Sequence, residues 1–260
     1  MKDRILVCRQ GSLAWHEARR GIPTASEADK IITPVRGKPA AEASRYAYQL
    51  LAERLLNATG TTLDGLPYLE RGKQCEPEAV AEYQFENDCK LIEVGFMLSE
   101  CRRYGASPDR LIEGRKAAVE VKSPSAATHI QYLVEGKLPA SYTPQVMMQI
   151  LVGELEYVDF YSYHPRCPTF TLRTYRDEAY LAKLKDALDA FCDNLDEMER
   201  KARATGLWQP YARLAMPTDA SMTDAVEGAH AAEFMGGTPD VGEPPLRVSR
   251  YTAEDYMAAP

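Results

Sequence analysis

The stretch ASPDRLIEGRKAAVEVKSP, residues 106–124, carries two acidic residues that its own pattern brings face to face. A two-residue turn at Gly114-Arg115 would be of type II′, which favours glycine at its first central position. In that register the flanking strands pair antiparallel, and Asp109 falls opposite Glu120. Opposed residues in such a pair have Cβ atoms about 4.5–5.5 Å apart on one face of the sheet. The sequence therefore predicts a hairpin in which two carboxylates share a face.

Two carboxylates this close repel each other unless a positive group lies between them. A divalent cation suits that place, because Mg²⁺ takes one or two protein carboxylates and keeps its other positions for water and phosphate oxygen. Strand alternation puts Lys122 on the face of Glu120, with Val119 and Val121 pointing into the core. The pattern suits metal-assisted hydrolysis of a phosphodiester. The spacing alone is equally compatible with a surface hairpin in which Asp109 belongs to a turn and the other charges are solvated.

The chain has 260 residues, of which 45% are apolar, so it can build one sizeable α/β domain or two small ones. No apolar run approaches the length of a membrane span, and the first ten residues lack the apolar core of a signal peptide. We therefore expect a cytoplasmic protein that makes no membrane contact. The six cysteines show no CxxC spacing, which argues against a zinc site, an iron–sulfur cluster or a disulfide framework.

Charge is distributed unevenly along the chain, whose formal net charge is −7. Residues 1–75 carry 12 Lys and Arg against 8 Asp and Glu, whereas residues 213–260 carry 3 against 8. A basic surface for nucleic acid must therefore come from the first part of the chain, and the acidic end would repel phosphate.

Periodicity and turn signals predict one domain over residues 1–211, followed by an acidic extension rich in Ala, Gly and Pro over 212–260. Two short helices are expected around a turn at Gly21–Pro23, and further along a loop precedes a helix with Pro77 near its start. The other helices are predicted within 41–60, 125–136, 142–155 and 177–204, and strands within 90–95, 102–112, 116–124, 157–165 and 169–175.

The triplet Asp109, Glu120 and Lys122, with Pro108 before the first acid, resembles the signature of the PD-(D/E)xK nuclease superfamily. The likeness extends to four blocks that follow one another across residues 11–165. They read GSLAWHEARRGIPTASEADKIIT, RGKQCEPEAVAEYQF, ASPDRLI with VEVKSP, and YTPQVMMQILVG. Together they resemble the phage lambda exonuclease and YqaJ-like viral recombinase family. The resemblance implies an α/β fold with a central mixed β-sheet flanked by helices, which is the restriction-endonuclease-like nuclease core.

The resemblance also implies an activity: a Mg²⁺-dependent exonuclease that degrades one strand of linear double-stranded DNA from 5′ to 3′ and leaves a 3′ overhang. Such an overhang would serve phage-type homologous recombination through a single-strand annealing protein. The family further implies two Mg²⁺ ions per active site, replaceable by Mn²⁺, a homotrimeric ring around the DNA, and a phage or prophage protein in the cytosol of a bacterial host. The periodicity of the sequence does not itself indicate a trimer.

By the same resemblance, Asp109 and Glu120 would ligate the metal ions, with the carbonyl of Val121 as a further ligand. Lys122 matches the catalytic lysine and would position or deprotonate the attacking water. Glu76 matches a helical glutamate that reaches the same site. The alternative for this glutamate is an ordinary acid near a helix start, where the helix dipole favours negative charge.

Gln145 matches a catalytic-site glutamine in the helix after the hairpin, although a partly buried amide that packs the site is equally compatible. The family often has a second glutamine two residues later, where this chain has Met147, but Gln149 lies one turn along on nearly the same face. An arginine expected in a phosphate pocket falls near Thr128 or His129. A histidine is mostly neutral at pH 7, so it would replace that arginine only in part.

Arg19, Ser26 and Ser107 match residues that hold the 5′-phosphate of the DNA in the family. An arginine binds phosphate through a charge-assisted fork, and a serine at a helix start brings free N–H groups with it. The alternative for Arg19 is a solvated helix end. Trp15 is interpreted as structural.

Four more residues are predicted to contact DNA. By the resemblance, Leu69 or Tyr68 beside it, on a loop, matches a hydrophobic wedge that splays the terminal base pair, although a plain core leucine is equally compatible. Lys73 adds positive charge beside that loop, and Arg36 matches a basic loop residue that contacts DNA. A loop arginine surrounded by solvent is the alternative for Arg36.

Two other functions remain open from the sequence. An endonuclease of the same superfamily would cut closed circular duplex. A non-catalytic DNA-end-binding recombination module would keep the fold without releasing nucleotides, and the intact set of Asp109, Glu120 and Lys122 argues against it.

Overall fold

The structure, a computed structural model, describes residues 4–57 and 67–206, and the side chains of these residues except 67–73. The described residues up to Glu199 belong to one compact unit. Among the described residues, no helix combines the length and the apolar character needed to cross a bilayer. The predicted extension over 212–260 lies outside the described residues, so its boundary at residue 211 stays a prediction.

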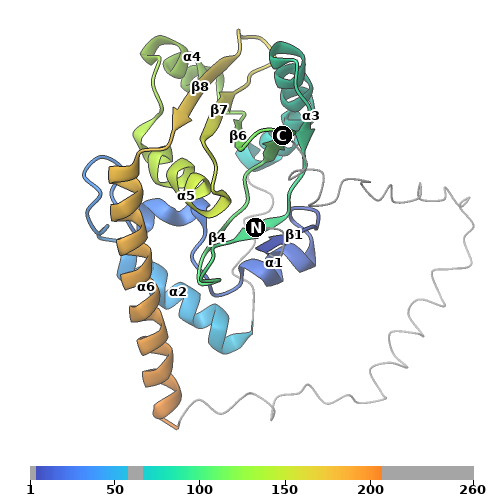
Figure 1. Cartoon of the computed structure of the whole chain (residues 1–260). Coiled ribbons are helices and arrows are strands. Elements are labelled where there is room, and N and C mark those ends of the chain that lie inside the picture. Colours follow the sequence, from blue (N-terminus) through green and yellow to red (C-terminus); the bar gives the residue numbers. More distant parts are fainter. Residues whose placement is uncertain (1–3, 58–66, 207–260) are drawn as a thin grey trace, which may run out of the picture. The chain divides into compact units, whose positions relative to one another are not determined.

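A five-stranded mixed sheet forms the centre of this unit, in the order β2-β5-β6-β7-β8 (Figure 1). The central strands β6 and β7 run parallel, and the other neighbours pair antiparallel. Because a parallel pair needs a long crossover, the chain between these two strands forms helices. The elements are β2 (Leu91–Ile92), β5 (Arg110–Ile112), β6 (Ala117–Lys122), α4 (Ala126–Glu135), the 3-10 helix η3 (Ala140–Tyr142), α5 (Thr143–Gly153), β7 (Tyr157–Ser162) and β8 (Phe170–Tyr175). The predicted α/β fold with a mixed sheet is confirmed.

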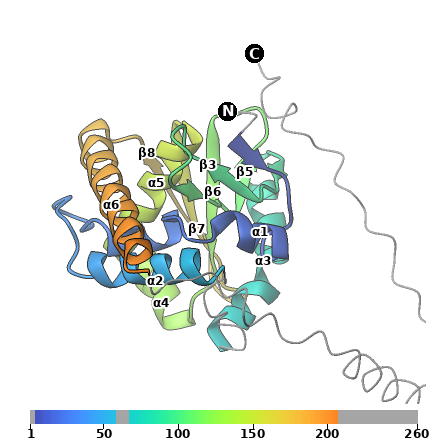
Figure 2. The ribbon, with the colours of Figure 1, turned by 90° about the horizontal axis from the view of Figure 1, so that it is seen from below.

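Helices cover both faces of the large sheet. Figure 2 shows α3 and α6 on opposite sides of the strands. On the side of α3, Tyr83 packs in a small apolar cluster with Val119, Val121 and Tyr161. The helices outside the crossover are α1 (Leu13–Arg19), the 3-10 helix η2 (Ala25–Lys30), α2 (Ala43–Leu56), α3 (Pro67–Asn87) and α6 (Glu178–Ala204). The larger apolar core lies on the other side of the sheet from α3 and draws on η2, α2, α5 and α6.

A small antiparallel sheet lies ahead of the β5–β6 hairpin in the chain, with strands β1 (Ile5–Leu6), β3 (Phe96–Leu98) and β4 (Gly105–Ala106) in the order β1-β3-β4. The strand predicted over 102–112 is therefore wrong as one element, because β4 belongs to the small sheet and β5 to the large one. The break falls at 107–109, where Pro108 has no N–H to continue a ladder. Gln10 holds this crossing segment by donating 2.9 Å hydrogen bonds from Nε2 to the carbonyls of Val94 and Pro108.

The hairpin register predicted from the sequence is confirmed. Arg110 pairs with Val119 and Leu111 with Ala118, which sets Asp109 level with Glu120. The predicted two-residue turn is wrong. The N–H of Arg115 bonds to the carbonyl of Ile112, 3.2 Å away, so Gly114 occupies the third position of the turn instead of the second. Its φ of 71° explains why glycine stands there.

Helix α3 begins earlier than the sequence predicted. Its first residue is Pro67, which costs nothing there because the first N–H groups of a helix have no intrahelical partner. Pro77 therefore lies in the helix interior and not near its start. Tyr68 and Leu69, predicted on a loop, lie in the first turn of this helix, and the structure describes no side-chain position for them or for Lys73.

Candidate active site

Asp109 and Glu120 meet where β5 and β6 pair. Asp109 directly precedes β5, and its Oδ2 accepts a 2.7 Å hydrogen bond from the backbone N–H of Val121. On β6, strand alternation sends Val119 and Val121 toward α3, whereas Glu120 points to the opposite face, toward α5. The acid from one strand end and the acid from the neighbouring strand are thus held at a fixed separation by the sheet itself.

Glu120 is the most tightly held group of the site, with 2% of its surface exposed. Its Oε1 accepts hydrogen bonds of 2.5 Å from the ammonium of Lys122 and from Nε2 of Gln145. Its Oε2 accepts one of 2.5 Å from Nε2 of Gln149. Both glutamines come from α5, where they lie one turn apart, so the structure brings the predicted Gln145 to the acid pair and adds Gln149. Met147, between them in sequence, is buried.

The electrostatics of the pair leave it short of positive charge. Burial, and after it the neighbouring Glu120, raises the pKa of Asp109 to about 8 against the opposing effect of Lys122. Burial acts to lower the pKa of Lys122, but the two acids outweigh burial, so the pKa of this lysine lies above its usual value. One ammonium therefore does not fully compensate the buried carboxyl group of Glu120 and the partly buried one of Asp109.

The residues present fit a hard divalent cation. Among the described residues, no group of three or more His, Cys, Asp or Glu side chains is arranged to hold a metal ion. Asp109 and Glu120 do supply two carboxylates, and Mg²⁺ binds through one or two and keeps water in its other positions. Oε1 of Gln149 is buried and has no hydrogen-bond partner in the described part of the chain. An oxygen donor set of this kind suits Mg²⁺ or Mn²⁺ better than a softer metal.

Glu76 reaches the edge of this site from α3. Its Oε1 forms a 2.9 Å ion pair with Nη1 of Arg110, the residue after Asp109, and its charge contributes to the raised pKa of Asp109. Because α3 begins nine residues earlier, at Pro67, the alternative of an acid at a helix start is wrong. The structure brings Glu76 to Arg110, and its role in catalysis stays a prediction.

Arg19, Ser26 and Ser107 come together in a second cluster. Nη1 of Arg19 lies 3.4 Å from the hydroxyl of Ser107, and Nη2 lies 3.2 Å from that of Ser26 and 3.5 Å from that of Thr24. The guanidinium also lies over the ring of Trp15, 4.0 Å from its centroid. Burial lowers the pKa of Arg19. Within the described residues no carboxylate lies within ion-pair distance of it, so the cluster is suited to an anion.

Ser107 holds Arg19 in place instead of offering a free hydroxyl. It donates to the carbonyl of Gly95, 2.7 Å away, and accepts from Nε1 of Trp15 at 2.9 Å as well as from Arg19. A hydroxyl has one proton and two lone pairs, so all three are used. Trp15, interpreted as structural from the sequence, also contacts Arg19, which the sequence reasoning did not predict. The i, i+4 spacing of the two residues on one helix could have indicated this contact.

Two further candidates lie away from both clusters. Arg36 is exposed in the turn after η2, in which Gly37 approaches the side chain of Lys183 on α6. His129 is fully buried: its Nε2 bonds to the carbonyl of Pro168 at 2.8 Å and its Nδ1 to the hydroxyl of Ser162 at 2.7 Å. The suggestion that His129 partly replaces a phosphate-binding arginine is therefore wrong, because both ring nitrogens are used inside the protein.

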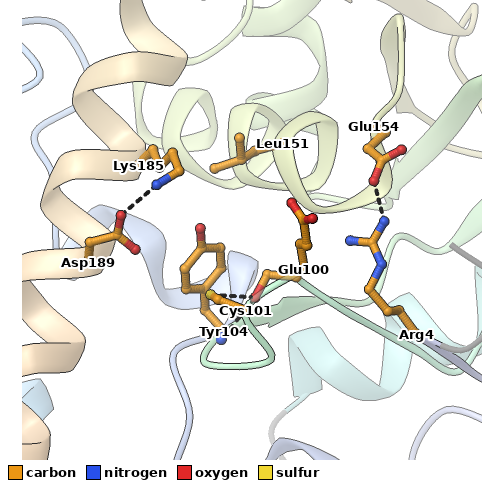
Figure 3. A pocket seen from close by; sticks show the side chains of 9 residues that line it. Arg4, Glu100, Cys101, Tyr104, Leu151, Glu154, Lys185 and Asp189 are labelled. Atoms are coloured by element: carbon orange, nitrogen blue, oxygen red, sulfur yellow. Dashed lines mark hydrogen bonds and ion pairs between the residues drawn. The ribbon is translucent and has the colours of Figure 1, made fainter.

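A separate cavity of about 320 Å³ lies between the β3–β4 turn, the end of α5 and α6 (Figure 3). Tyr104 and Glu100 line it, and its two cations are paired with acids: Arg4 with Glu154, and Lys185 with Asp189 at 2.7 Å. It shares no residue with the acid pair or the Arg19 cluster. Since its cations are engaged by acids, it does not resemble an anion site.

Comparison with known proteins places the chain in a family. Residues 14–156 match the model of the YqaJ-like viral recombinase domain. The chain belongs to the YqaJ-like viral recombinase family. The matched range contains both the acid pair and the Arg19 cluster of this YqaJ-like protein. No curated protein matches the sequence.

Solved structures share the fold of this YqaJ-like protein. An alkaline exonuclease (LHK-Exo) from Laribacter hongkongensis superposes with a TM-score of 0.68 at 28% identity, over 75% of this chain and 98% of that one. The structure of LHK-Exo in complex with dAMP matches equally well. A phage-related exonuclease from Haemophilus somnus 129PT has a TM-score of 0.55 at 15% identity, over 70% of this chain and 96% of that one, and shares the fold.

Proposed function

We propose that this protein is a Mg²⁺-dependent exonuclease that degrades one strand of linear duplex DNA from a 5′-phosphorylated end. The single observation that carries the proposal is the connection between its two clusters. Ser107 contacts Arg19 and lies two residues before Asp109. Two residues of chain span at most about 7 Å. The anion-binding arginine and the acid pair can therefore contact the same strand end, and the likeness to LHK-Exo supports a nuclease.

The acid pair would hold the metal ions. Asp109 and Glu120 provide the carboxylates, with the Val121 carbonyl as the further ligand, and Gln145 and Gln149 fix the orientation of Glu120 through both of its oxygens. When bound, Mg²⁺ would supply a water of lowered pKa and stabilise charge on the phosphate.

Lys122 is charged beside these acids, because its pKa lies above the usual value. Its ammonium lies 2.5 Å from Oε1 of Glu120. We assign Lys122 to orienting the attacking water and stabilising negative charge on the scissile phosphate, a role that its position beside the metal-binding acids supports. Of the two roles predicted from the sequence, positioning is the one that its electrostatic surroundings favour.

The Arg19 cluster would hold the 5′-phosphate that each hydrolysis step creates. A phosphate anchored there keeps the shortened strand at the acid pair for the next step. The product would be duplex with a 3′ overhang, the substrate of a single-strand annealing protein. A homotrimeric ring and a place in phage recombination belong to the same proposal and rest on the family to which the chain belongs.

The test uses linear duplex with a 5′-phosphate and a separate 3′ label on each strand, incubated with Mg²⁺ or with EDTA. With Mg²⁺ we expect mononucleotides to be released from the 5′ ends while the 3′ labels stay on long fragments. With EDTA we expect no release. Asp109→Asn, which keeps the shape of the side chain, should bind duplex ends without digesting them.

Three results would overturn the proposal. Loss of the 3′ labels first would reverse the polarity, and digestion of closed circular duplex would indicate an endonuclease. Binding without any Mg²⁺-dependent or Mn²⁺-dependent release of nucleotides would indicate a non-catalytic end-binding module.

A further inference from the structure

The turn between α1 and η2 is held by the side chains of α2. Gly21, at its centre, has a φ of 69°. Its N–H donates to Oε2 of Glu53 at 2.9 Å, and its carbonyl accepts from Nε of Arg54 at 2.6 Å. Consecutive residues of one helix thus satisfy both backbone groups of a single turn residue. A Cβ at Gly21 would lie 2.4 Å from Cγ of Arg54, so the fit leaves no room for another residue there.

This turn sets the distance between the two elements that supply the anion-binding cluster. Arg19 is the last residue of α1, and Ser26 lies in η2 on the other side of the turn. Their side chains meet at 3.2 Å. The same helix α2 also holds the far side of the turn, since the hydroxyl of Tyr46 accepts a 3.3 Å hydrogen bond from the N–H of Thr24.

Arg54 is in turn fixed by the long helix α6. Its Nη1 lies 2.8 Å from a carboxylate oxygen of Asp196 and 3.1 Å from one of Glu199. The guanidinium fork therefore bonds a backbone carbonyl through Nε and two acids through Nη1. A lysine has a single ammonium and cannot reproduce both sets of bonds at once.

We propose that Glu53 and Arg54 are positioning residues that set the preference of this protein for 5′-phosphorylated ends. They keep the Gly21 turn in one conformation, so that Arg19 and Ser26 face the same phosphate before the DNA arrives. The inference rests on the proposed function, because it assumes that the Arg19 cluster binds the terminal phosphate. Loosening the turn would leave the acid pair untouched and would add an ordering cost to each phosphate-binding event.

The experiment compares linear duplexes with a 5′-phosphate and with a 5′-hydroxyl, in separate reactions with the same preparation of full-length protein and Mg²⁺. The ratio of kcat/KM on the two ends is the readout, because a partly unfolded preparation lowers both rates equally and leaves the ratio unchanged. The variants at the two positioning residues are Glu53→Ala, Glu53→Gln and Arg54→Lys. Gln49→Ala, at an exposed position of the same helix, is the matched control.

We expect Glu53→Ala and Arg54→Lys to lower the preference for phosphorylated ends by about tenfold, the size of one lost hydrogen bond. The loss should appear in KM for phosphorylated ends, with kcat on hydroxyl ends unchanged. Glu53→Gln keeps an oxygen acceptor for the Gly21 N–H and should restore most of the preference. Gln49→Ala should behave as the wild type.

The outcomes separate this inference from the function on which it rests. If the wild type does not distinguish the two ends, or if Arg19→Ala keeps the full preference, the Arg19 cluster does not bind the terminal phosphate. Glu53 and Arg54 then have no phosphate pocket to position, and the proposed function fails at this point. If Arg19→Ala loses the preference while Glu53→Ala and Arg54→Lys keep it and only unfold at lower temperature, the two residues are purely structural and the inference is overturned.

Discussion

Burial gives Asp109 a charge state that changes near neutral pH. With a pKa of about 8 in the metal-free protein, its carboxyl group is mostly protonated at pH 7. Mg²⁺ requires the carboxylate, so binding must release that proton. We expect the apparent affinity for Mg²⁺ to rise between pH 6 and about 8 and to level off above that. Titration calorimetry in two buffers of different ionisation enthalpy should show release of about one proton per chain at pH 7.

Asp109→Asn provides the control for this prediction. It keeps an oxygen that can accept the N–H of Val121 but cannot lose a proton. Any remaining Mg²⁺ binding by this variant should have lost most of its pH dependence. An affinity of the wild type that is constant from pH 6 to 9 would contradict the raised pKa. So would a pH dependence that persists unchanged in the variant.

Local pattern identified most residues of the site but not what each one touches. The spacing of Asp109 and Glu120 followed from strand pairing, which is a local property. The roles of Ser107 and His129 depend on partners far away in the sequence. Gly95, Trp15 and Arg19 together use up the hydroxyl of Ser107, and both ring nitrogens of His129 are bonded, to Ser162 and Pro168. Such partners are set by tertiary packing, which a motif does not contain.

At the scale of elements, the segment 107–109 matters most, because it joins the two sheets and carries both Ser107 and Asp109. Gln10 holds its centre through the carbonyl of Pro108. We expect Gln10→Ala to lower kcat on phosphorylated ends about tenfold, since Asp109 is then less well oriented toward Glu120. Val94 and Pro108 are both buried, so the two freed carbonyls lose partners that water replaces poorly, and the unfolding temperature should also fall, by roughly 10 °C.

The rival explanation is general destabilisation, and temperature separates the two. Assays at 15 °C, well below unfolding, should still show the loss of kcat if orientation is responsible. Recovery of wild-type kcat at that temperature would assign Gln10 to stability alone.

Sequence patterns located the elements better than their ends. The register of the β5–β6 hairpin and the crossover helices were predictable, because alternation and helical periodicity extend over several residues. The split at Pro108 and the start of α3 at Pro67 were not. Pro108 fits either an interrupted strand or a turn, and Pro67 fits either a loop or the start of a helix. The choice depends on which neighbouring surface the segment can bury.

At the scale of the whole molecule, the part of the chain that carries the proposed phosphate-binding residues and the segment 213–260 carry opposite charge. Arg19 and Ser26 lie within residues 1–75, which have a surplus of four positive charges, whereas residues 213–260 have a surplus of five negative ones. Repulsion between an acidic segment and DNA acts over roughly a Debye length, about 10 Å at 0.1 M salt. Wherever the acidic segment comes within this distance of bound DNA, it should weaken DNA binding in dilute salt.

A variant that ends at Gly206 tests this effect. We expect it to bind duplex ends several-fold more tightly than the full chain at 50 mM salt and equally at 300 mM, where the charges are screened. Its kcat and unfolding temperature should stay close to those of the full chain, because the contacts that build the acid pair and the Arg19 cluster come from residues before 200.

The matched control is the full-length chain with the eight acids of 213–260 replaced by their amides, which removes charge and keeps length. If the control binds like the wild type while the shortened variant binds differently, length and not charge is responsible. Weaker binding by both would show that the acidic segment contributes to DNA capture, for example by supporting an assembly of several chains.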